Sequence, residues 1–161
     1  MAFTERDVIS VLQKIFATAD PRLSVGIGDD AAVVATKSQS IITSDMAVED
    51  VHFKLEWSSA FDIGRKITAA NVADILSMGG KCDYLTASVA LTGEETLQWI
   101  ENLARGMKHE ADLAGHFGDG RELCRTPVPG VQLHGPRAGG RDRCHLLHGR
   151  SGVVPEGVEA R

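Results

Sequence analysis

The chain changes composition near Gly115, and regular patterns of apolar residues occur only before that point. Residues 116–161 contain 7 Arg and no Lys, no Ile, 9 of the 17 Gly and 4 of the 5 Pro. Segments of this composition without periodicity are typical of disordered tails. We therefore predict one folded domain over residues 1–115 and a disordered tail over residues 116–161.

The first 115 residues alternate between helical and strand-like patterns. Apolar residues recur every three or four positions in three long segments and alternate or cluster in three short ones. The predicted helices span residues 3–19, 60–80 and 93–115, and the predicted strands span residues 29–36, 39–45 and 83–92. Thr4 is the expected N-cap of the first helix, with Asp7 three residues later, and the first two strands are expected to form a hairpin. The pattern predicts an α/β (α+β) domain, a small mixed sheet flanked by helices.

The bulk composition is that of a globular protein and argues against several classes of function. Hydrophobic residues make up 43% and charged residues 24%, with a net charge of −5, so nucleic acid is not an expected partner. No apolar run approaches the roughly 18 residues of a membrane span, and the N-terminus lacks the apolar core of a signal peptide. The three cysteines are widely spaced and are expected to be reduced thiols. These features predict a cytoplasmic protein without a membrane partner.

Acidic and amide residues gather where the predicted elements end or share a face. They are Asp29 and Asp30 in “VGIGDDAAVV”, Asp45 at the end of “QSIITSD”, and Asn71 and Asp74 on one face of the second helix. If the strand ends lie beside that helix, several carboxylates converge, and a hard divalent cation is their natural partner. Oxygen ligands without clustered His or Cys favour Mg²⁺ over Zn²⁺, and Mg²⁺ bound by carboxylates commonly also binds substrate phosphates.

Each of these residues also has an ordinary structural interpretation. Adjacent aspartates after glycine are common in solvated turns, and Asp45 could cap a turn. The two helical residues could form the solvated face of their helix, and His52 in “DVHF” could be a partly buried histidine. Their occurrence together on two strands and one helix, with the hydroxyls of Thr43 and Ser44 beside Asp45, favours a shared site. The sequence contains no Walker-type G-x-x-x-x-G-K-[ST] loop.

Three linked motifs resemble thiamine-monophosphate kinase, a family in the superfamily of aminoimidazole-ribonucleotide synthetase and selenophosphate synthetase. They are “GIGDDAAVV”, “TSDMAVEDVHF” and “AANVADILSMGGKCDYLTASVAL”, in the order and spacing of the family over about residues 4–115. The loop that ends in His-Phe favours this family over hydrogenase-maturation relatives, which have a glycine-rich turn there. The resemblance implies the N-terminal domain of the aminoimidazole-ribonucleotide synthetase-like fold, which pairs through its sheet into a homodimer.

The resemblance also implies ATP-dependent phosphorylation of thiamine monophosphate to thiamine diphosphate, with Mg²⁺ as the cofactor. The implied metal ligands are Asp30, Thr43, Ser44, Asp45 and Asp74. His52 would contact the thiamine phosphate, and Asp29 and Asn71 would support the site. No covalent or acid–base catalyst is implied, because phosphoryl transfer depends chiefly on positioning and charge neutralisation.

The resemblance is expected to end near Gly115. The family continues with a Gly-Gly-Asp loop that binds ATP and metal and then with a second domain, whereas here “LAG” is followed by “HFGDGREL”. A one-base shift of reading frame can turn codons for this segment into the expected strand and turn, so the tail is interpreted as a frameshift product. The chain is thus expected to be an incomplete or inactive fragment. The alternatives are a non-catalytic Mg²⁺-binding, nucleotide-binding or dimerisation module, a kinase for another small substrate, and a hydrogenase-maturation relative.

Overall fold

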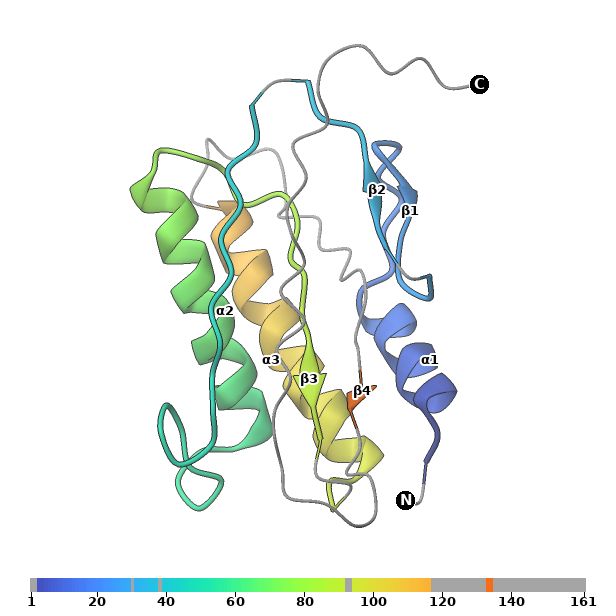
Figure 1. The fold of residues 1–161 in the computed structure, drawn as a ribbon, viewed down its shortest axis with the longest axis vertical. Coiled ribbons are helices and arrows are strands. Elements are labelled where there is room, and N and C mark those ends of the chain that lie inside the picture. Colours follow the sequence, from blue (N-terminus) through green and yellow to red (C-terminus); the bar gives the residue numbers. More distant parts are fainter. Residues whose placement is uncertain (1–2, 30, 38, 92–93, 117–132, 135–161) are drawn as a thin grey trace.

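Three helices form most of the domain in the computed structural model, which describes residues 3–29, 31–37, 39–91, 94–116 and 133–134 (Figure 1). They are α1 (Glu5–Ile15), α2 (Ala60–Ser77) and α3 (Leu97–His116). Helix α3 packs against both α2 and α1 and lies between them. Helices α1 and α2 fall within the segments whose periodicity predicts them, and α3 extends one residue beyond its predicted segment.

Side chains at their N-termini begin the first two helices. The Thr4 hydroxyl accepts a hydrogen bond from the Asp7 N–H at 3.4 Å, and the Asp7 carboxylate accepts one from the Thr4 N–H at 2.7 Å. These two reciprocal bonds satisfy two otherwise unpaired backbone N–H groups, as expected for a capping box. Ser59 caps α2 by accepting from the Asp62 N–H at 3.2 Å. These local signals confirm the predicted start of the first helix.

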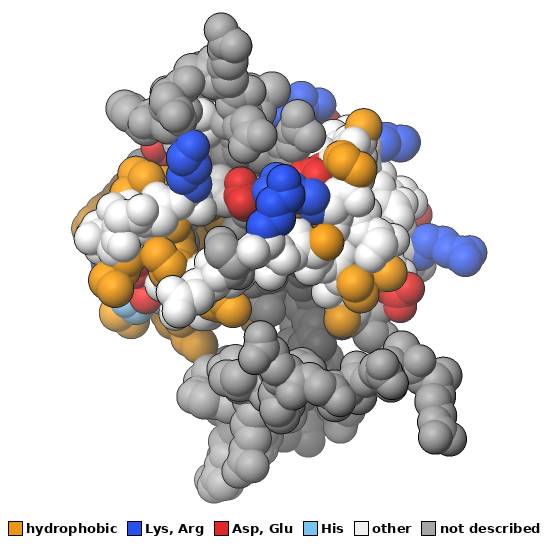
Figure 2. Space-filling view, turned by 90° about the horizontal axis from the view of Figure 1, so that it is seen from above, with side chains coloured by type: hydrophobic (Ala, Val, Ile, Leu, Met, Phe, Trp, Pro, Cys, Tyr) orange, Lys and Arg blue, Asp and Glu red, His pale blue; other side chains and the backbone are white. Residues whose placement is uncertain are grey.

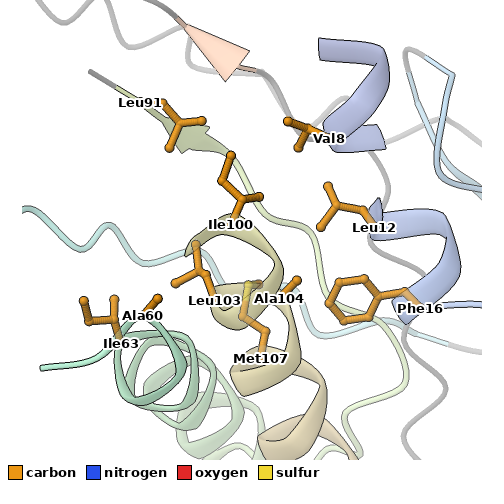
Figure 3. Packing of buried hydrophobic residues seen from close by; sticks show 10 residues of the cluster. All are labelled: Val8, Leu12, Phe16, Ala60, Ile63, Leu91, Ile100, Leu103, Ala104 and Met107. Carbon is orange, nitrogen blue, oxygen red and sulfur yellow. The ribbon is translucent and has the colours of Figure 1, made fainter. Parts of the chain in front are cut away.

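The hydrophobic core lies where α1 and α2 meet neighbouring parts of one α3 face (Figure 3). Its buried members are Val8, Leu12, Phe16, Ala60, Ile63, Leu91, Ile100, Leu103, Ala104 and Met107. Figure 3 shows the α1 side chains directed toward Ala104 and Ile100, while Ile63 and Ala60 approach Leu103 from α2. Both helices therefore pack on the same face of α3, and this packing fixes the position of α2 and the direction of its polar face.

Two glycines allow α2 and α3 to approach closely. A Cβ atom at Gly64 would lie 2.2 Å from the Leu103 carbonyl oxygen, and one at Gly106 would lie 2.0 Å from the Phe61 carbonyl oxygen. Both distances are far below van der Waals contact. Only glycine fits at these two positions while the helix backbones keep this separation.

The strands are short and form two separate pairs. Strands β1 (Leu23–Val25) and β2 (Val33–Val34) are antiparallel, and β3 (Val89–Ala90) pairs in parallel with β4 (Leu133–His134). The α+β class is confirmed. Within the described residues, however, the expected single mixed sheet is replaced by these two pairs.

The predicted hairpin between residues 29–36 and 39–45 is wrong. Strand β2 pairs instead with the preceding strand, with Leu23 opposite Val34. In the described part of residues 39–45 the chain is extended without strand partners, and its polar groups bond to side chains of α2. Helix α2 has therefore replaced a neighbouring strand as the partner of this segment.

The predicted disorder of residues 116–161 lies almost wholly outside the described residues. His116 ends α3, and Leu133 and His134 form β4. Among the helices that the structure describes, none is both long and apolar enough to cross a membrane.

Candidate functional site

The extended segment after β2 runs along the polar face of α2 and is bound to it by side chains. The Thr43 hydroxyl donates to the Asp74 carboxylate at 3.2 Å, and the Asp45 N–H donates to the Asn71 side-chain oxygen at 3.1 Å. These bonds connect residues 31 and 26 positions apart in sequence. Four of the predicted site residues are therefore brought together: Thr43, Asp45, Asn71 and Asp74.

Helix α2 holds these acceptors in place by its own geometry. Asn71 and Asp74 are three residues apart, so their side chains emerge from one face of the helix. The Asn71 side-chain N–H group donates to the Ile67 carbonyl at 3.0 Å, which leaves its oxygen free to accept from Asp45. The orientation of the Asn71 amide is thus fixed from both ends.

Oxygen atoms make up this group, which agrees with a hard cation rather than with zinc. Ser44, Asp45 and Asp74 are exposed, and Thr43 is half-buried. Within the described ranges, no three His, Cys, Asp or Glu residues are close enough to hold a metal ion. The donor chemistry fits Mg²⁺, while these residues supply only part of a ligand set.

The loop that carries Asp29 lies against α1. The Gln13 side-chain N–H group donates to the Ile27 carbonyl at 2.8 Å, and Gly28 has a φ of 113°, which only glycine adopts readily. Asp29 is exposed in this loop. Asp30 lies outside the described residues, so its predicted convergence with Asp45 and Asp74 stays a prediction. Gln13 was not predicted, because a lone polar residue on a helix resembles any solvated position.

His52 lies in a compact loop between the extended segment and α2. Its Nδ1 accepts a hydrogen bond from the Val48 N–H at 3.1 Å, and its carbonyl accepts one from the Lys66 ammonium group of α2. An acceptor Nδ1 means that the proton of the neutral ring is on Nε2. The exposed imidazole therefore offers an N–H donor to a ligand. Lys66 was not predicted from the sequence, which gives no local signal for this long-range contact.

A second polar group, unrelated to the predicted site, connects the exit of α1 to the segment before β3. The Asp20 side chain, only 1% exposed, forms an ion pair with Arg22 at 2.9 Å and accepts from the Tyr84 hydroxyl at 2.9 Å. Arg22 also pairs with Asp83 at 3.2 Å. In the sequence, Asp20 and Pro21 indicated only the end of a helix, so this group was missed.

These contacts shift the ionisation of the group. Hydrogen bonds from Arg22 hold the pKa of the Asp20 carboxyl well below its usual range. Burial, and then the hydrogen bond to Asp20, raises the pKa of Tyr84 to about 12. The charged and hydroxyl groups of this cluster bond to one another. We therefore interpret the cluster as stabilising the fold rather than as a reactive site.

Residues 28–117, more than half of the chain, match the family described as AIR synthase related protein, N-terminal domain. The match begins at Gly28 and includes the extended segment, the His52 loop and α2. It therefore covers all of the predicted site residues.

Individual relatives agree with this assignment. A thiamine-monophosphate kinase of Bacillus subtilis (strain 168) is 44% identical over 93 residues, which are 56% of this chain and 29% of that protein. One of Mycobacterium tuberculosis (strain ATCC 25618 / H37Rv) is 34% identical over 139 residues, which are 84% of this chain and 39% of that protein. The chain thus spans well under half the length of these two curated relatives.

A solved structure shows the same fold. The crystal structure of thiamine-monophosphate kinase from Stenotrophomonas maltophilia K279a matches with a TM-score of 0.63 and 28% identity, over 84% of this chain and 40% of that one. The resemblance inferred from the three motifs is thereby confirmed. The chain belongs to the family of AIR synthase related proteins, in the region that forms their N-terminal domain.

Proposed function

We propose that the chain serves the ATP-dependent phosphorylation of thiamine monophosphate to thiamine diphosphate, in the cytoplasm. The observation that carries this proposal is the attachment of Thr43, Asp45 and His52 to α2, which holds a hydroxyl, a carboxylate and an imidazole-bearing residue on one helix. The names of the two relatives and of the solved structure agree with it. The chain spans less than half of those proteins, so we propose that it does not complete the reaction alone.

In this proposal Asp30, Thr43, Ser44, Asp45 and Asp74 hold Mg²⁺, with Asp29 and Asn71 in support. Bound Mg²⁺ would neutralise the charge of the ATP phosphates. The residues of this chain contribute positioning, because Asn71 holds the Asp45 backbone and Asp74 holds Thr43. His52 offers its Nε2–H to an oxygen of the thiamine phosphate. Such fixed donors and charges are what phosphoryl transfer requires from a protein.

Thermal unfolding of the full chain with and without Mg²⁺ and ATP tests the binding part of the proposal. Ligands that bind only the folded state raise the melting temperature, by roughly 5 °C when well above their dissociation constants. Asp74→Asn should abolish most of this shift, because it removes a charge while keeping the shape of the acceptor for Thr43. The matched control is Asp50→Asn in the His52 loop, where Asp50 has a φ of 63° that asparagine tolerates.

Two outcomes would count against the proposed site. The absence of any shift in the wild-type chain would mean that these residues do not bind Mg²⁺ and ATP by themselves. An equal shift in both variants would place the binding elsewhere. Transfer of labelled phosphate from ATP to thiamine monophosphate, measured with the remaining part of a relative added in trans, distinguishes a kinase from a binding module.

We further propose that two copies pair through the apolar surface of residues 41–57 and the end of α2. Nine large hydrophobic residues are exposed there: Ile41, Ile42, Met46, Val48, Val51, Leu55, Trp57, Leu76 and Met78. Figure 2, seen from above, shows exposed hydrophobic side chains on the side where α2 lies and also on the other side of the molecule. Exposed apolar patches of this extent commonly mark interfaces.

A further inference from the structure

Three side chains of α2 hold the extended segment and the His52 loop that follows it, and the contacts follow the order of the chain. Asp74 binds Thr43, Asn71 binds the backbone of Asp45, and Lys66 binds the backbone of His52. As the helix is followed from its C-terminal to its N-terminal end, the segment advances toward His52. The first two contacts involve predicted site residues, whereas Lys66 has no assigned role.

The backbone bonds of the His52 loop fix its shape but not its place on the molecule. The His52 N–H donates to the Val48 carbonyl at 2.8 Å, and the Asp50 N–H donates to the Phe53 carbonyl at 2.8 Å. Both bonds stay within the loop. Phe53 packs against the hydrophobic core, and the Lys66 ammonium group bonds to the His52 carbonyl. Lys66 therefore contributes the polar anchor of the loop at the residue that carries the imidazole.

The position of the loop determines what the imidazole can bind. With Nδ1 accepting from the Val48 N–H, the neutral ring exposes only Nε2–H, which is a donor. A matching ligand group must be an acceptor, such as a phosphate oxygen. The Val48 N–H bond to Nδ1 lies within the loop and is exposed, so without the anchor on α2 it would open more often. The ring could then exchange tautomers and would lose this single polarity.

We propose that Lys66 is a positioning residue that holds the His52 loop on α2, so that the imidazole presents Nε2–H to a phosphate oxygen of the substrate. This inference deepens the proposed function and rests on it for the identity of the ligand. The placement of the loop and the tautomer can be measured without any ligand.

The test compares the full wild-type chain with Lys66→Met, which keeps much of the apolar stem but loses the ammonium donor. Nitrogen NMR spectra of the histidine rings, recorded at mildly alkaline pH, report the tautomer through the separation of the two ring-nitrogen shifts. His52→Gln identifies the His52 signals by their loss. We expect a wide separation in the wild type and a reduced one in Lys66→Met, with Lys66→Arg restoring it.

Lys108→Met is the matched control, because Lys108 pairs with Asp112 within α3 and does not contact the loop. It should leave the His52 signals unchanged. A similar melting temperature in all variants is expected, since Lys66 is exposed. If Lys66→Met keeps the wild-type separation of shifts, the inference is overturned.

Titration with thiamine monophosphate measures how the substitutions change the affinity for the proposed ligand. We expect Lys66→Met to bind roughly tenfold more weakly than the wild type, which is the size of effect of one hydrogen bond to a charged group, and Lys66→Arg to recover most of the loss. Failure of the wild type to bind thiamine monophosphate, with the NMR difference intact, would reject the proposed substrate and leave the positioning role supported. Equal affinity of the wild type and Lys66→Met would reject the role of Lys66 in ligand binding.

Discussion

Asp20 is the one charged side chain classified as buried among the described residues, and its environment shows how the fold accommodates it. Arg22 and Tyr84 together satisfy its carboxylate, and the Arg22 guanidinium lies 5.4 Å from the centre of the Tyr84 ring. Arg22 remains one-third exposed, so part of the pair is still hydrated. Burial of a carboxylate without such partners would be strongly unfavourable.

Asp20→Asn should reduce the stability of the domain near neutral pH by about 2 kcal/mol, the typical loss when a hydrogen-bonded charge is removed. Because the pKa of Asp20 is lowered on folding, its ionised form stabilises the fold above the unfolded-state value near 3.8. That stability is lost as the pH falls below about 4 toward the lower folded-state pKa. Urea unfolding at several pH values should therefore show the wild type and Asp20→Asn converging in acid. A difference that stays constant from pH 7 downward would contradict this role.

Tyr84 gives the opposite dependence at alkaline pH. Its pKa rises from 10.0 to about 12 on folding, so its contribution to stability is complete below pH 10 and is lost as the pH rises through 12. Tyr84→Phe lacks this ionisation and should lose less stability than the wild type between those values, although it starts lower because the hydrogen bond to Asp20 is gone. Thermal unfolding across that range checks the prediction, and parallel curves for the two proteins would contradict it.

At the scale of the elements, the close crossing of α2 and α3 determines the position of the candidate site. The glycines at the crossing allow backbone contact, and the Arg65–Glu110 ion pair at 3.0 Å joins the same two helices. Because α2 holds the segment of Thr43 and Asp45, a shift of this helix would also shift the candidate site. Packing and function are therefore coupled through one helix.

Gly64→Ala should destabilise the domain by about 2 kcal/mol, since the overpacking penalty exceeds the gain in helix propensity of roughly 1 kcal/mol. The new Cβ atom would lie 2.2 Å from the Leu103 carbonyl oxygen, and backbone cannot move aside as a flexible side chain can. Asn102→Ala, at an exposed position of α3, is the control and should be nearly neutral. Denaturant unfolding measures both; a Gly64→Ala variant as stable as the wild type would show that the helices can separate without cost.

The helices could be predicted from the sequence because their signals are local. Thr4 and Asp7 lie within one turn, and the apolar residues of α3 recur on one face. The strands could not, because pairing joins distant residues: β3 finds its partner at Leu133, and short runs of Val and Ile fit several partners equally well. The expected strand of residues 39–45 proved to be an extended segment on a helix.

The candidate site was partly predictable for the same reason. Asn71 and Asp74 share a helical face that spacing alone identifies, and the run from Thr43 to Asp45 stands out by its composition. Lys66 acts through a backbone carbonyl 14 residues away, which no spacing rule reveals. A bond to a backbone carbonyl places no demand on the type of the partner residue. Positioning residues of this kind can therefore be identified only from a structure.

At the scale of the whole molecule, the distribution of apolar residues is uneven. Among the residues that the structure describes, nine of the eleven exposed large hydrophobic residues lie on residues 41–57 or at the end of α2, while the core side of the helices is well covered. Ile42 is 83% and Met78 71% exposed. Together they make this surface the candidate contact between two copies.

The pairing of two copies through this surface predicts concentration-dependent association. Sedimentation equilibrium of the wild-type chain at micromolar to tens-of-micromolar concentration should give a mass approaching twice 17.2 kDa. The double variant Ile42→Ser, Met78→Ser should remain a monomer, because burial contributes roughly 25 cal/mol per Å² of apolar surface and association must first overcome the entropy of bringing two molecules together. Both residues are exposed, so the fold should tolerate the change.

Leu113→Ser, which alters an exposed leucine on α3, is the control and should associate as the wild type does. A wild type that stays monomeric over the whole range would reject self-pairing through this surface, and equal loss of association in the control would mean that the contact is not confined to it.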